Sequence, residues 1–319
     1  AFFKYEPRAM SALICGSLAY DTIMVFPDQF KNHILPDKVH ILNVSFLVPR
    51  MRREFGGCAG NIAYNLKLLG GDPVPMATVG QDFGPYRQWF EENGITLERV
   101  KVIEELFTPQ AFITTDHDNN QITAFHPGAM MRSYENHVKD VPGVTIGIVS
   151  PDGYEGMVQN AKEFAECGIP FIFDPGQAMP LFNGEELRAF IEQADYVTVN
   201  DYESNLLQER TGWNEKDIVQ RVKAYIVTRG PKGAVIHTPD KSYEVPPAHE
   251  RRVTDPTGCG DAFRAGLIFG IEKGYDWMTI GRIGNLMGAL KVEHPGTQNQ
   301  RFDFPEFAEQ FRQQFGYSL

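Results

Sequence analysis

From residue 144 to residue 228, short apolar runs alternate with stretches of helical spacing. Short apolar runs of this kind suit buried parallel strands. Strands that alternate with helices predict an α/β fold with a doubly wound, mostly parallel sheet flanked by helices. The expected strands are Val144–Val149, Phe171–Phe173, Tyr196–Val199 and Ala224–Thr228, and the expected helices are Tyr154–Cys167, Glu185–Glu192 and Glu203–Arg221 with a break near Gly212.

The N-terminal half combines this pattern with elements of another kind. Residues 22–56 hold β-branched and aromatic residues that suggest extended structure, although Pro27, Pro36 and Pro49 interrupt it. A hairpin is predicted further on, and no low-complexity linker divides the chain. We expect one domain over residues 1–319, with a small inserted β-strand lid formed by about 22–56 and 108–127. The elements expected here are the strands Ala12–Cys15 and Val74–Val79, the helix Phe83–Asn93, the hairpin strands Gln110–Thr115 and Gln121–His126, and extended structure around Val39, Ile41, Val44, Phe46 and Val48.

A glycine-rich loop leads into a helix at residues 254–266. Pro256, Gly258 and Gly260 favour a loop, and the apolar spacing from Asp261 to Gly274 predicts the helix. The first N–H groups of a helix favour an anion, yet the carboxylate of Asp261 stands at this position. An acid at an anion site suggests phosphoryl transfer with Asp261 as the base. A capped surface helix would explain the stretch about as well.

A second glycine-rich loop, Gly56-Gly57-Cys-Ala-Gly-Asn61, also leads into a helix. Glycine allows a ligand to approach the backbone, and Asn61 offers both a donor and an acceptor. Tight packing would explain the glycines but not Asn61. Polar residues also follow several predicted strands, at the sheet edge where α/β proteins bind ligands. For Asp21, its position alone gives a turn or cap role the same weight as a role in ligand binding. These polar residues are Asp21, Asp174, Gln177, Asn200, Asp201, Glu203 and the segment 228–233.

Charge and motif spacing exclude several classes of protein. A formal net charge of −11 and a pI near 5.2 argue against a nucleic-acid partner. The residues around Lys232 do not match a P-loop, and Gly258-Cys-Gly260 does not extend to a dinucleotide motif. The four cysteines form no C-x-x-C pair. With no signal peptide in the first residues and no membrane-spanning run, we expect a cytoplasmic protein without a membrane partner.

The two glycine-rich loops, in this order and at this separation, resemble the motifs of the ribokinase (PfkB-type) carbohydrate kinase family. The resemblance extends over about residues 12–300 and includes Asn200-Asp-Tyr-Glu203, which is similar to the N-x-x-E motif of the family. It implies a ribokinase-like fold. Within the family, the chain looks closest to the bacterial ribokinase-like adenosine kinases through Gly16-Ser17 with Asp21, Ser45-Phe-Leu-Val48, Phe125-His-Pro-Gly-Ala-Met130 and Gly296-Thr-Gln298.

The resemblance implies an ATP- and Mg²⁺-dependent kinase that phosphorylates the 5′-hydroxyl of adenosine. Asp261 would be the base, beside an anion hole of N–H groups, and we expect it to stay ionised near neutral pH. Many relatives also use a monovalent cation near this loop, so the resemblance allows for activation by K⁺. By their implied roles, the site residues are Gly258, Cys259 and Gly260 in the anion hole; Asp21, Gly57 and Asn61 at the ribose; Ser17, Ser45, Phe125 and Gln177 around the nucleoside; Asn200, Thr228, Gly230, Gly233 and Asn285 along ATP; and Glu203 at Mg²⁺.

Several alternatives remain open at this point. The acceptor could be ribose, fructose, inosine or guanosine, and a regulator that has kept the fold and lost turnover would retain the same motifs. Cys259 is either a reactive thiol with a lowered pKa or a small space-filler. Arg264 either organises Asp261, contacts phosphate or forms a structural ion pair. Open strand edges in the lid favour a homodimer.

Overall fold

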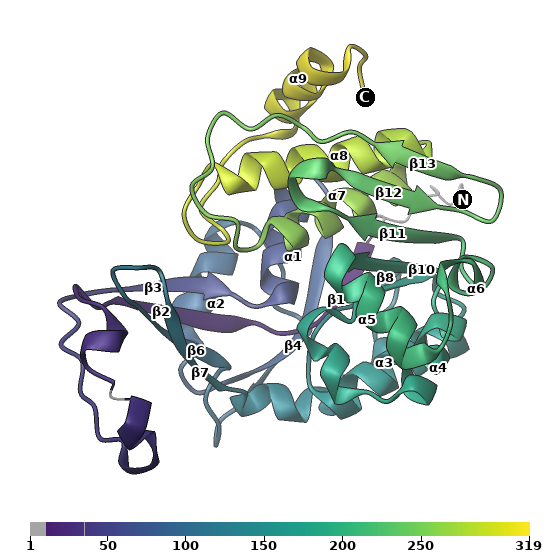
Figure 1. Cartoon of the computed structure of the whole chain (residues 1–319). Helices are drawn as coiled ribbons and strands as arrows, with labels where there is room; N and C mark the ends of the chain where they lie inside the picture. Colours follow the sequence, from purple (N-terminus) through teal and green to yellow (C-terminus); the bar gives the residue numbers. More distant parts are fainter. Residues whose placement is uncertain (1–10, 35) are drawn as a thin grey trace.

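The computed structural model describes residues 11–34 and 36–319, so the expectation about the first residues lies outside the described ones. Its main sheet contains nine strands in the order β13-β12-β11-β10-β9-β8-β1-β4-β5 (Figure 1). Neighbouring strands run parallel except in the pairs β11–β12 and β12–β13. The bounds are β1 Ser11–Cys15, β4 Pro73–Gly80, β5 Val100–Ile103, β8 Val144–Val149, β9 Phe171–Phe173, β10 Tyr196–Asn200, β11 Ala224–Thr228, β12 Ala234–His237 and β13 Ser242–Val245.

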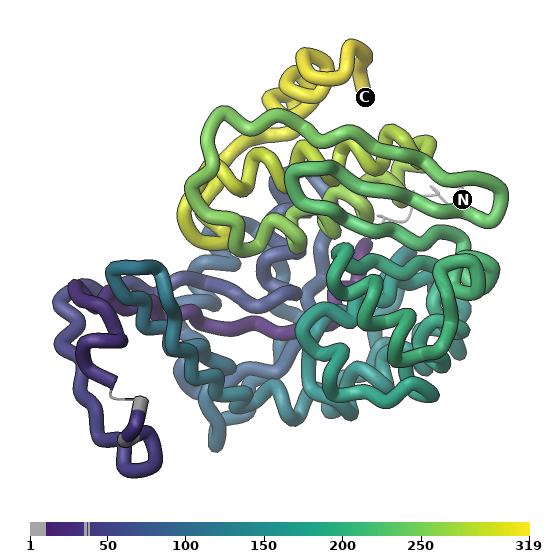
Figure 2. Tube along the Cα trace, in the orientation of Figure 1, coloured from purple at the N-terminus to yellow at the C-terminus, as the bar shows by residue number. Residues whose placement is uncertain are grey.

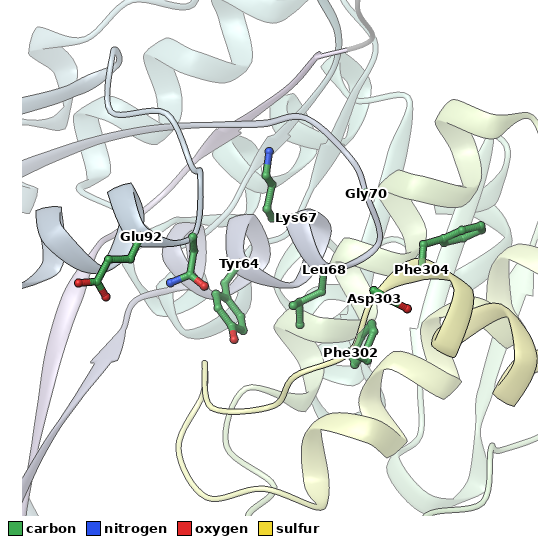
Figure 3. A pocket seen from close by; sticks show the side chains of 9 residues that line it. Tyr64, Lys67, Leu68, Gly70, Glu92, Phe302, Asp303 and Phe304 are labelled. Carbon is green, nitrogen blue, oxygen red and sulfur yellow. The ribbon is translucent and has the colours of Figure 1, made fainter.

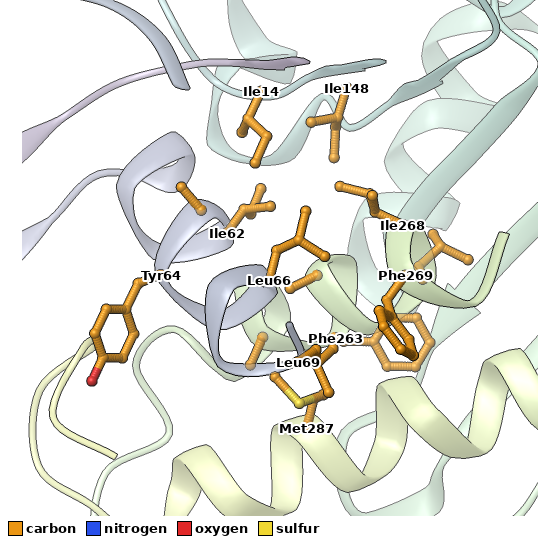
Figure 4. Packing of buried hydrophobic residues seen from close by; sticks show 14 of the residues in the cluster. Ile14, Ile62, Tyr64, Leu66, Leu69, Ile148, Phe263, Ile268, Phe269 and Met287 are labelled. Carbon is orange, nitrogen blue, oxygen red and sulfur yellow. The ribbon is translucent and has the colours of Figure 1, made fainter. Parts of the chain in front are cut away.

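Helices cover both faces of this sheet. Ala12 and Ile14 of β1 belong to one buried cluster, whereas Leu13 and Cys15 belong to another, because successive side chains of a strand point to opposite faces. The first cluster (Figure 4) packs beneath α1 Cys58–Leu68, α2 Gly84–Glu92, α7 Cys259–Lys273, α8 Trp277–Val292 and α9 Phe304–Phe315. The second packs beneath α3 Tyr154–Glu166, α4 Gly184–Gln193, α5 Asp201–Thr211 and α6 Glu215–Val219. The predicted doubly wound α/β fold is confirmed.

The order of the strands shows where the winding of the sheet reverses. From β1 the chain continues through β4 and β5 on one side, and β8 to β13 follow on the other side. In such sheets, ligands bind outside the carboxyl ends of the strands at the point of reversal. The carboxyl ends of β1 and β8 are therefore the place to search for a site.

A second sheet of four strands, in the order β3-β2-β6-β7, projects from one side of the main sheet (Figure 1). Figure 2 shows that segments from the two ends of the N-terminal half meet there, since β2 pairs in parallel with β6. This sheet occupies much of the two stretches for which we expect a lid, although its closure over a ligand and its pairing with a second copy stay predictions. The bounds are β2 Ala19–Val25, β3 Arg50–Gly56, β6 Gln110–Thr115 and β7 Gln121–His126.

Two expectations about local structure are wrong. The extended structure expected around residues 39–48 is absent from the described residues: a short 3-10 helix, Pro36–Ile41, is followed by a stretch without regular structure up to Pro49. Asp21 lies within β2 of the second sheet rather than just beyond the end of β1. The other short 3-10 helices are Phe30–Asn32, Gly128–Glu135, Val138–Asp140, Gly176–Leu181 and Gly230–Lys232.

Helices α7 and α8 pack closely against each other. A Cβ on Gly266 would lie 2.9 Å from the Cα of Gly284, so neither position has room for a larger side chain. Phe263 fills the space beside Gly284. Across the described ranges, 11–34 and 36–319, none of the helices combines the length and apolar character needed to cross a bilayer.

Candidate active site

The two glycine-rich loops meet although about 200 residues separate them. Nδ2 of Asn61 on α1 donates a hydrogen bond to Oδ2 of Asp261 on α7 at 2.8 Å. Each helix begins after a glycine with positive φ, +84° at Gly57 and +80° at Gly258, a conformation that other residues adopt at a cost. Helix α7 begins at Cys259, two residues earlier than predicted. The structure therefore places Asp261 in the first turn, as an anion site requires.

Backbone N–H groups at the start of α7 are free to bind an anion. Among the described residues, the N–H groups of Gly258 and Gly260 have no hydrogen-bond acceptor, whereas that of Cys259 donates to the carbonyl of Pro256 at 3.2 Å. The Cys259 donor is thus engaged in a turn. Burial raises the pKa of the Cys259 thiol to about 11, which contradicts the alternative of a lowered pKa.

A buried network holds Asn61 in a single orientation. Nε2 of Gln298 donates both to Oδ1 of Asn61, at 3.0 Å, and to the Tyr86 hydroxyl, at 2.8 Å. Nε1 of Trp89 in turn donates to Oε1 of Gln298 at 2.9 Å. With its oxygen held by Gln298, Asn61 must present its NH₂ group to Asp261. The sequence alone assigns no role to Gln298, although Gly296-Thr-Gln298 is one of the stretches that resemble the family.

The electrostatics of Asp261 differ from the expectation. Burial raises the pKa of Asp261 to about 7, and the opposing effects of the Asn61 hydrogen bond and the Arg264 charge are smaller. The prediction that Asp261 stays ionised near neutral pH is therefore wrong, because removal from water outweighs the favourable helix terminus. A carboxylate with a pKa near neutrality is a stronger base than an ordinary aspartate.

This pKa makes a prediction for stability. An acid whose pKa is higher in the folded than in the unfolded state destabilises the fold as pH rises between the two values. Asp261→Asn should therefore stabilise the protein by about 1–2 kcal/mol at about pH 8. A tenfold change in acidity corresponds to about 1.4 kcal/mol, and the stabilisation is smaller than the full difference in pKa would give because the carboxyl group is partly exposed to water. The gain should vanish near about pH 4. Urea denaturation at both pH values measures it, with Asp240→Asn in an exposed turn as the control. Equal gains at both pH values would contradict the raised pKa.

Arg264 forms a buried ion pair next to Asp261. Its Nε and Nη2 donate to the two carboxylate oxygens of Asp174 at 2.9 and 3.1 Å, and Nη1 donates to the carbonyl of Gly260 at 3.3 Å. Both side chains are less than a tenth exposed. Of the three alternatives for Arg264, the structure shows the ion pair. The pair anchors the first turn of α7 to the carboxyl end of β9.

Asp21, expected at the ribose, lies beside the loop that leads into α1. A Cβ on Gly56 would lie 2.5 Å from Oδ2 of Asp21, which places this carboxylate beside the loop that leads into α1. Burial, with a contribution from Glu54 across the strand pair, raises the pKa of Asp21 to about 6. Oγ of Ser17 accepts from the N–H of Cys58 at 3.3 Å and so satisfies the start of α1.

The remaining residues expected around the nucleoside are exposed. Phe125 on β7 is 52% exposed, and Ser45 lies in the irregular stretch before β3. Gln177 lies on the surface of the 3-10 helix after β9. The structure does not bring these three side chains into contact with Asp261. Of the three, only Phe125 lies on the second sheet.

A cavity of about 270 Å³ opens on the other side of the anion-binding turn. Four of the five residues expected along ATP line it, together with two from the start of α7. The cavity combines glycine backbone with apolar side chains, which suits a flat ligand with a polar end. The six residues are Thr228, Gly230, Gly233, Asn285, Cys259 and Gly260.

Asn200, the fifth residue, does not line the cavity. Its side chain accepts from the N–H of Glu203 at 2.7 Å, and Oε2 of Glu203 accepts from the N–H of Asn200 at 2.8 Å, so the two residues form the capping box of α5. Nη2 of Arg264 lies 4.0 Å from Oε2 of Glu203. In the part of the chain that the structure describes, no group of three or more His, Cys, Asp or Glu side chains is arranged for a metal. A metal here would depend mainly on oxygens from the ligand and water.

A larger cavity, of about 430 Å³, lies at the far end of α1 (Figure 3). Tyr64, Lys67 and Leu68 line it together with Phe302 and Phe304. None of the predicted site residues lines this cavity. Its size alone does not make it a site, because it lacks convergent polar groups near a perturbed acid.

Comparison with known proteins identifies the family to which the chain is similar. The model of the pfkB family of carbohydrate kinases matches residues 20–303. A solved structure of the Burkholderia thailandensis nucleoside kinase in complex with inosine is 53% identical, covers 96% of this chain and 99% of its own, and superposes with a TM-score of 0.88. The same nucleoside kinase has been solved in complex with ADP-inosine, at 55% identity, 96% and 97% coverage and a TM-score of 0.86.

Archaeal proteins are also similar to the chain. The solved nucleoside kinase of Methanocaldococcus jannaschii is 31% identical over 96% of this chain and 99% of its own, with a TM-score of 0.88. A nucleoside kinase of Methanothermobacter thermautotrophicus is 30% identical over 316 residues, which cover 96% of each protein.

Proposed function

The chain belongs to the pfkB family of carbohydrate kinases and is a phosphotransferase with a hydroxyl acceptor, and on this premise we propose that it phosphorylates the 5′-hydroxyl of purine ribonucleosides with ATP. The observation that supports this proposal best is the junction at Gly260, where the cavity lined by residues expected along ATP meets an anion-binding turn and the half-buried carboxylate of Asp261. The relative solved with inosine and with ADP-inosine supports a nucleoside acceptor.

In the proposed reaction, Asp261 accepts the proton of the 5′-hydroxyl as the hydroxyl oxygen attacks the γ-phosphorus of ATP, and the bond from that phosphorus to the bridging oxygen breaks to release ADP. The N–H groups of Gly258 and Gly260 stabilise the negative charge of the transferring group, which is the largest contribution a protein makes to phosphoryl transfer. Asn61 orients Asp261 through the hydrogen bond between them. Mg²⁺, held through water by Glu203, would neutralise charge on the phosphates of ATP.

Adenosine and inosine belong to the same proposed substrate class. Our sequence reasoning favours adenosine, whereas inosine is the ligand of the relative. The two bases differ at the 6-position, and the expected base contacts, Phe125 and Ser45, are exposed. An open base site discriminates weakly between an amino and an oxo group, because few buried polar groups are left unpaired by the wrong base.

An ATP-consumption assay over adenosine, inosine, guanosine, ribose, fructose and fructose 6-phosphate tests the proposal. Turnover should be fastest with a purine ribonucleoside. Turnover of fructose or ribose but of no nucleoside would favour a sugar kinase. A chain that binds ATP but phosphorylates none of the six would be a regulator.

We also predict a specific role for Asp21. With its carboxylate beside the α1 loop, it would accept hydrogen bonds from the ribose 2′- and 3′-hydroxyls and hold the 5′-oxygen against Asp261. A hydrogen bond to a charged group contributes about 1.5–3 kcal/mol, so Asp21→Ala should lower kcat/KM for adenosine by about 30-fold, mainly through KM.

The matched control for Asp21→Ala is the substrate rather than a second protein. With 3′-deoxyadenosine, which already lacks one partner hydroxyl, the same substitution should have a much smaller effect. An equal loss with both nucleosides would show that Asp21 does not contact the diol.

A further inference from the structure

Lys291, near the end of α8, is a lysine without exposed surface. Its Nζ donates to the main-chain carbonyl oxygens of Asp255, at 2.7 Å, and His294, at 3.1 Å. Within residues 11–34 and 36–319, no carboxylate oxygen lies within ion-pair distance of this ammonium group. Lysine is rarely buried without an acidic partner, because loss of hydration is costly. An ammonium group held by main-chain oxygens therefore calls for an explanation.

The position of Lys291 supplies the explanation. Asp255 lies three residues before Gly258, in the loop that leads to the anion-binding turn. The N–H groups of Thr254 and Asp255 donate to the carbonyl of Val292, so the end of α8 holds this loop from several sides. Lys291 thus places a positive charge directly behind the backbone that is proposed to receive the phosphoryl group.

The carboxylate of Asp255 is not available to Lys291, since backbone donors occupy it. Oδ1 of Asp255 accepts from the N–H of Thr257, and Oδ2 accepts from the N–H of Gly296, each at 2.9 Å. These bonds tie the loop before α7 to the loop after α8. Lys291 joins the same two loops through the carbonyl groups of Asp255 and His294, whose oxygens point toward its ammonium group.

Main-chain carbonyl oxygens arranged around one positive charge are also what a bound monovalent cation requires. The ammonium group of lysine is a compact point charge of comparable size with three donors. Because Nζ already occupies the carbonyls of Asp255 and His294, a free cation and Lys291 would compete for the same oxygens.

We propose that Lys291 is a positioning residue that acts as a built-in cation of the phosphoryl-binding loop, so that turnover requires no free monovalent cation. This inference rests on the proposed kinase function and replaces the expectation of activation by K⁺. The charge holds the loop in the conformation that directs the N–H groups of Gly258 and Gly260 toward the phosphoryl group.

The first experiment uses the unaltered protein. Initial rates are measured at constant ionic strength in K⁺, Na⁺ and choline chloride, with whichever acceptor the substrate panel identifies. Equal rates in the three salts are expected. Clear activation by K⁺ over choline would overturn the proposal. If no acceptor turns over, the proposed function fails, and the affinity for ATP is compared in the same three salts, where equal affinities are the expected result.

The second experiment removes the charge and then returns one. Lys291→Ala should lower kcat by about 30-fold with little change in the KM for the nucleoside, because a displacement of about 1 Å in a catalytic group costs up to about 100-fold. Added methylammonium or K⁺ should restore much of kcat by entering the space left by the side chain. Lys291→Met, which fills that space without a charge, should be as slow and should not respond.

Controls separate this role from a general loss of stability. Lys273→Met removes an exposed lysine at the end of α7 and should leave rate and salt response unchanged. Thermal unfolding is measured for each variant with and without added cation. Folded Lys291→Ala protein with undiminished kcat, or a loss that no cation reverses, would contradict the proposal. If neither Lys291 variant folds, the comparison of the three salts on the unaltered protein still tests the proposal.

Discussion

Replacing Asp261 with asparagine is expected to lower kcat by about 10³-fold, with little change in the KM for nucleoside or ATP, since general bases contribute about 10²–10⁴-fold. The amide cannot take the proton of the 5′-hydroxyl. Its oxygen can still accept the hydrogen bond that Asn61 donates, so the local geometry should persist. Steady-state kinetics of the variant measure the loss directly.

The pH dependence distinguishes loss of a base from a structural disturbance. With a pKa of about 7, Asp261 should make kcat/KM of the unaltered enzyme fall as pH drops below neutrality. The residual activity of Asp261→Asn should lack this acidic limb. Asp240→Asn, in an exposed turn, should keep the rate and the limb of the unaltered enzyme. A variant that retains most of its kcat would remove Asp261 as the base.

The main sheet could be predicted because its signals are local. Each strand from β8 to β11 is a short apolar run, and each intervening helix shows its own spacing, so boundaries agree within a few residues. The hairpin β6–β7 was likewise predicted at its observed bounds, because turn residues mark it. The edge strands β5 and β13 and strand β12 beside β13 were missed, since each is only four residues long and so shows little periodic pattern.

The irregular stretch before β3 shows where local pattern misleads. Val39 and Ile41 are β-branched, which favours strands, but both are exposed in the structure. β propensity reflects packing against neighbouring strands and burial of one face, and this stretch has neither. Prolines in the same stretch also disfavour a strand, because proline has no backbone N–H group to donate to a neighbouring strand.

The candidate residues Asp261 and Asn61 could be named from the sequence, but their electrostatics could not be predicted from it. Asp261 and Asn61 stand out in the sequence, whereas their contact depends on the packing of α1 against α7. The raised pKa of Asp261 comes from burial, which only the folded chain defines. Gln298 and Lys291 act through long-range contacts, so their sequence positions, in a loop and at a helix end, resemble ordinary surface positions.

The second large effect is expected at the ion pair of Arg264 with Asp174. Arg264→Met should lower the free energy of unfolding by about 3–5 kcal/mol, because removal of one partner leaves the other as an uncompensated buried charge. Asp174 is almost fully buried, and both of its oxygens accept from the guanidinium group. Urea denaturation near neutral pH measures the change.

A double variant separates the cost of the stranded charge from the value of the pair. Arg264→Met with Asp174→Leu replaces both partners by apolar groups of similar size and should recover much of the lost stability. Arg312→Met, which removes an exposed arginine bonded to Glu309, should change stability by less than about 1 kcal/mol. If the double variant were less stable than Arg264→Met, the pair itself would be stabilising, and its role would extend beyond the neutralisation of Asp174. Because Nη1 of Arg264 also holds the carbonyl of Gly260, a stable double variant with low kcat would show that the pair orders the phosphoryl-binding turn.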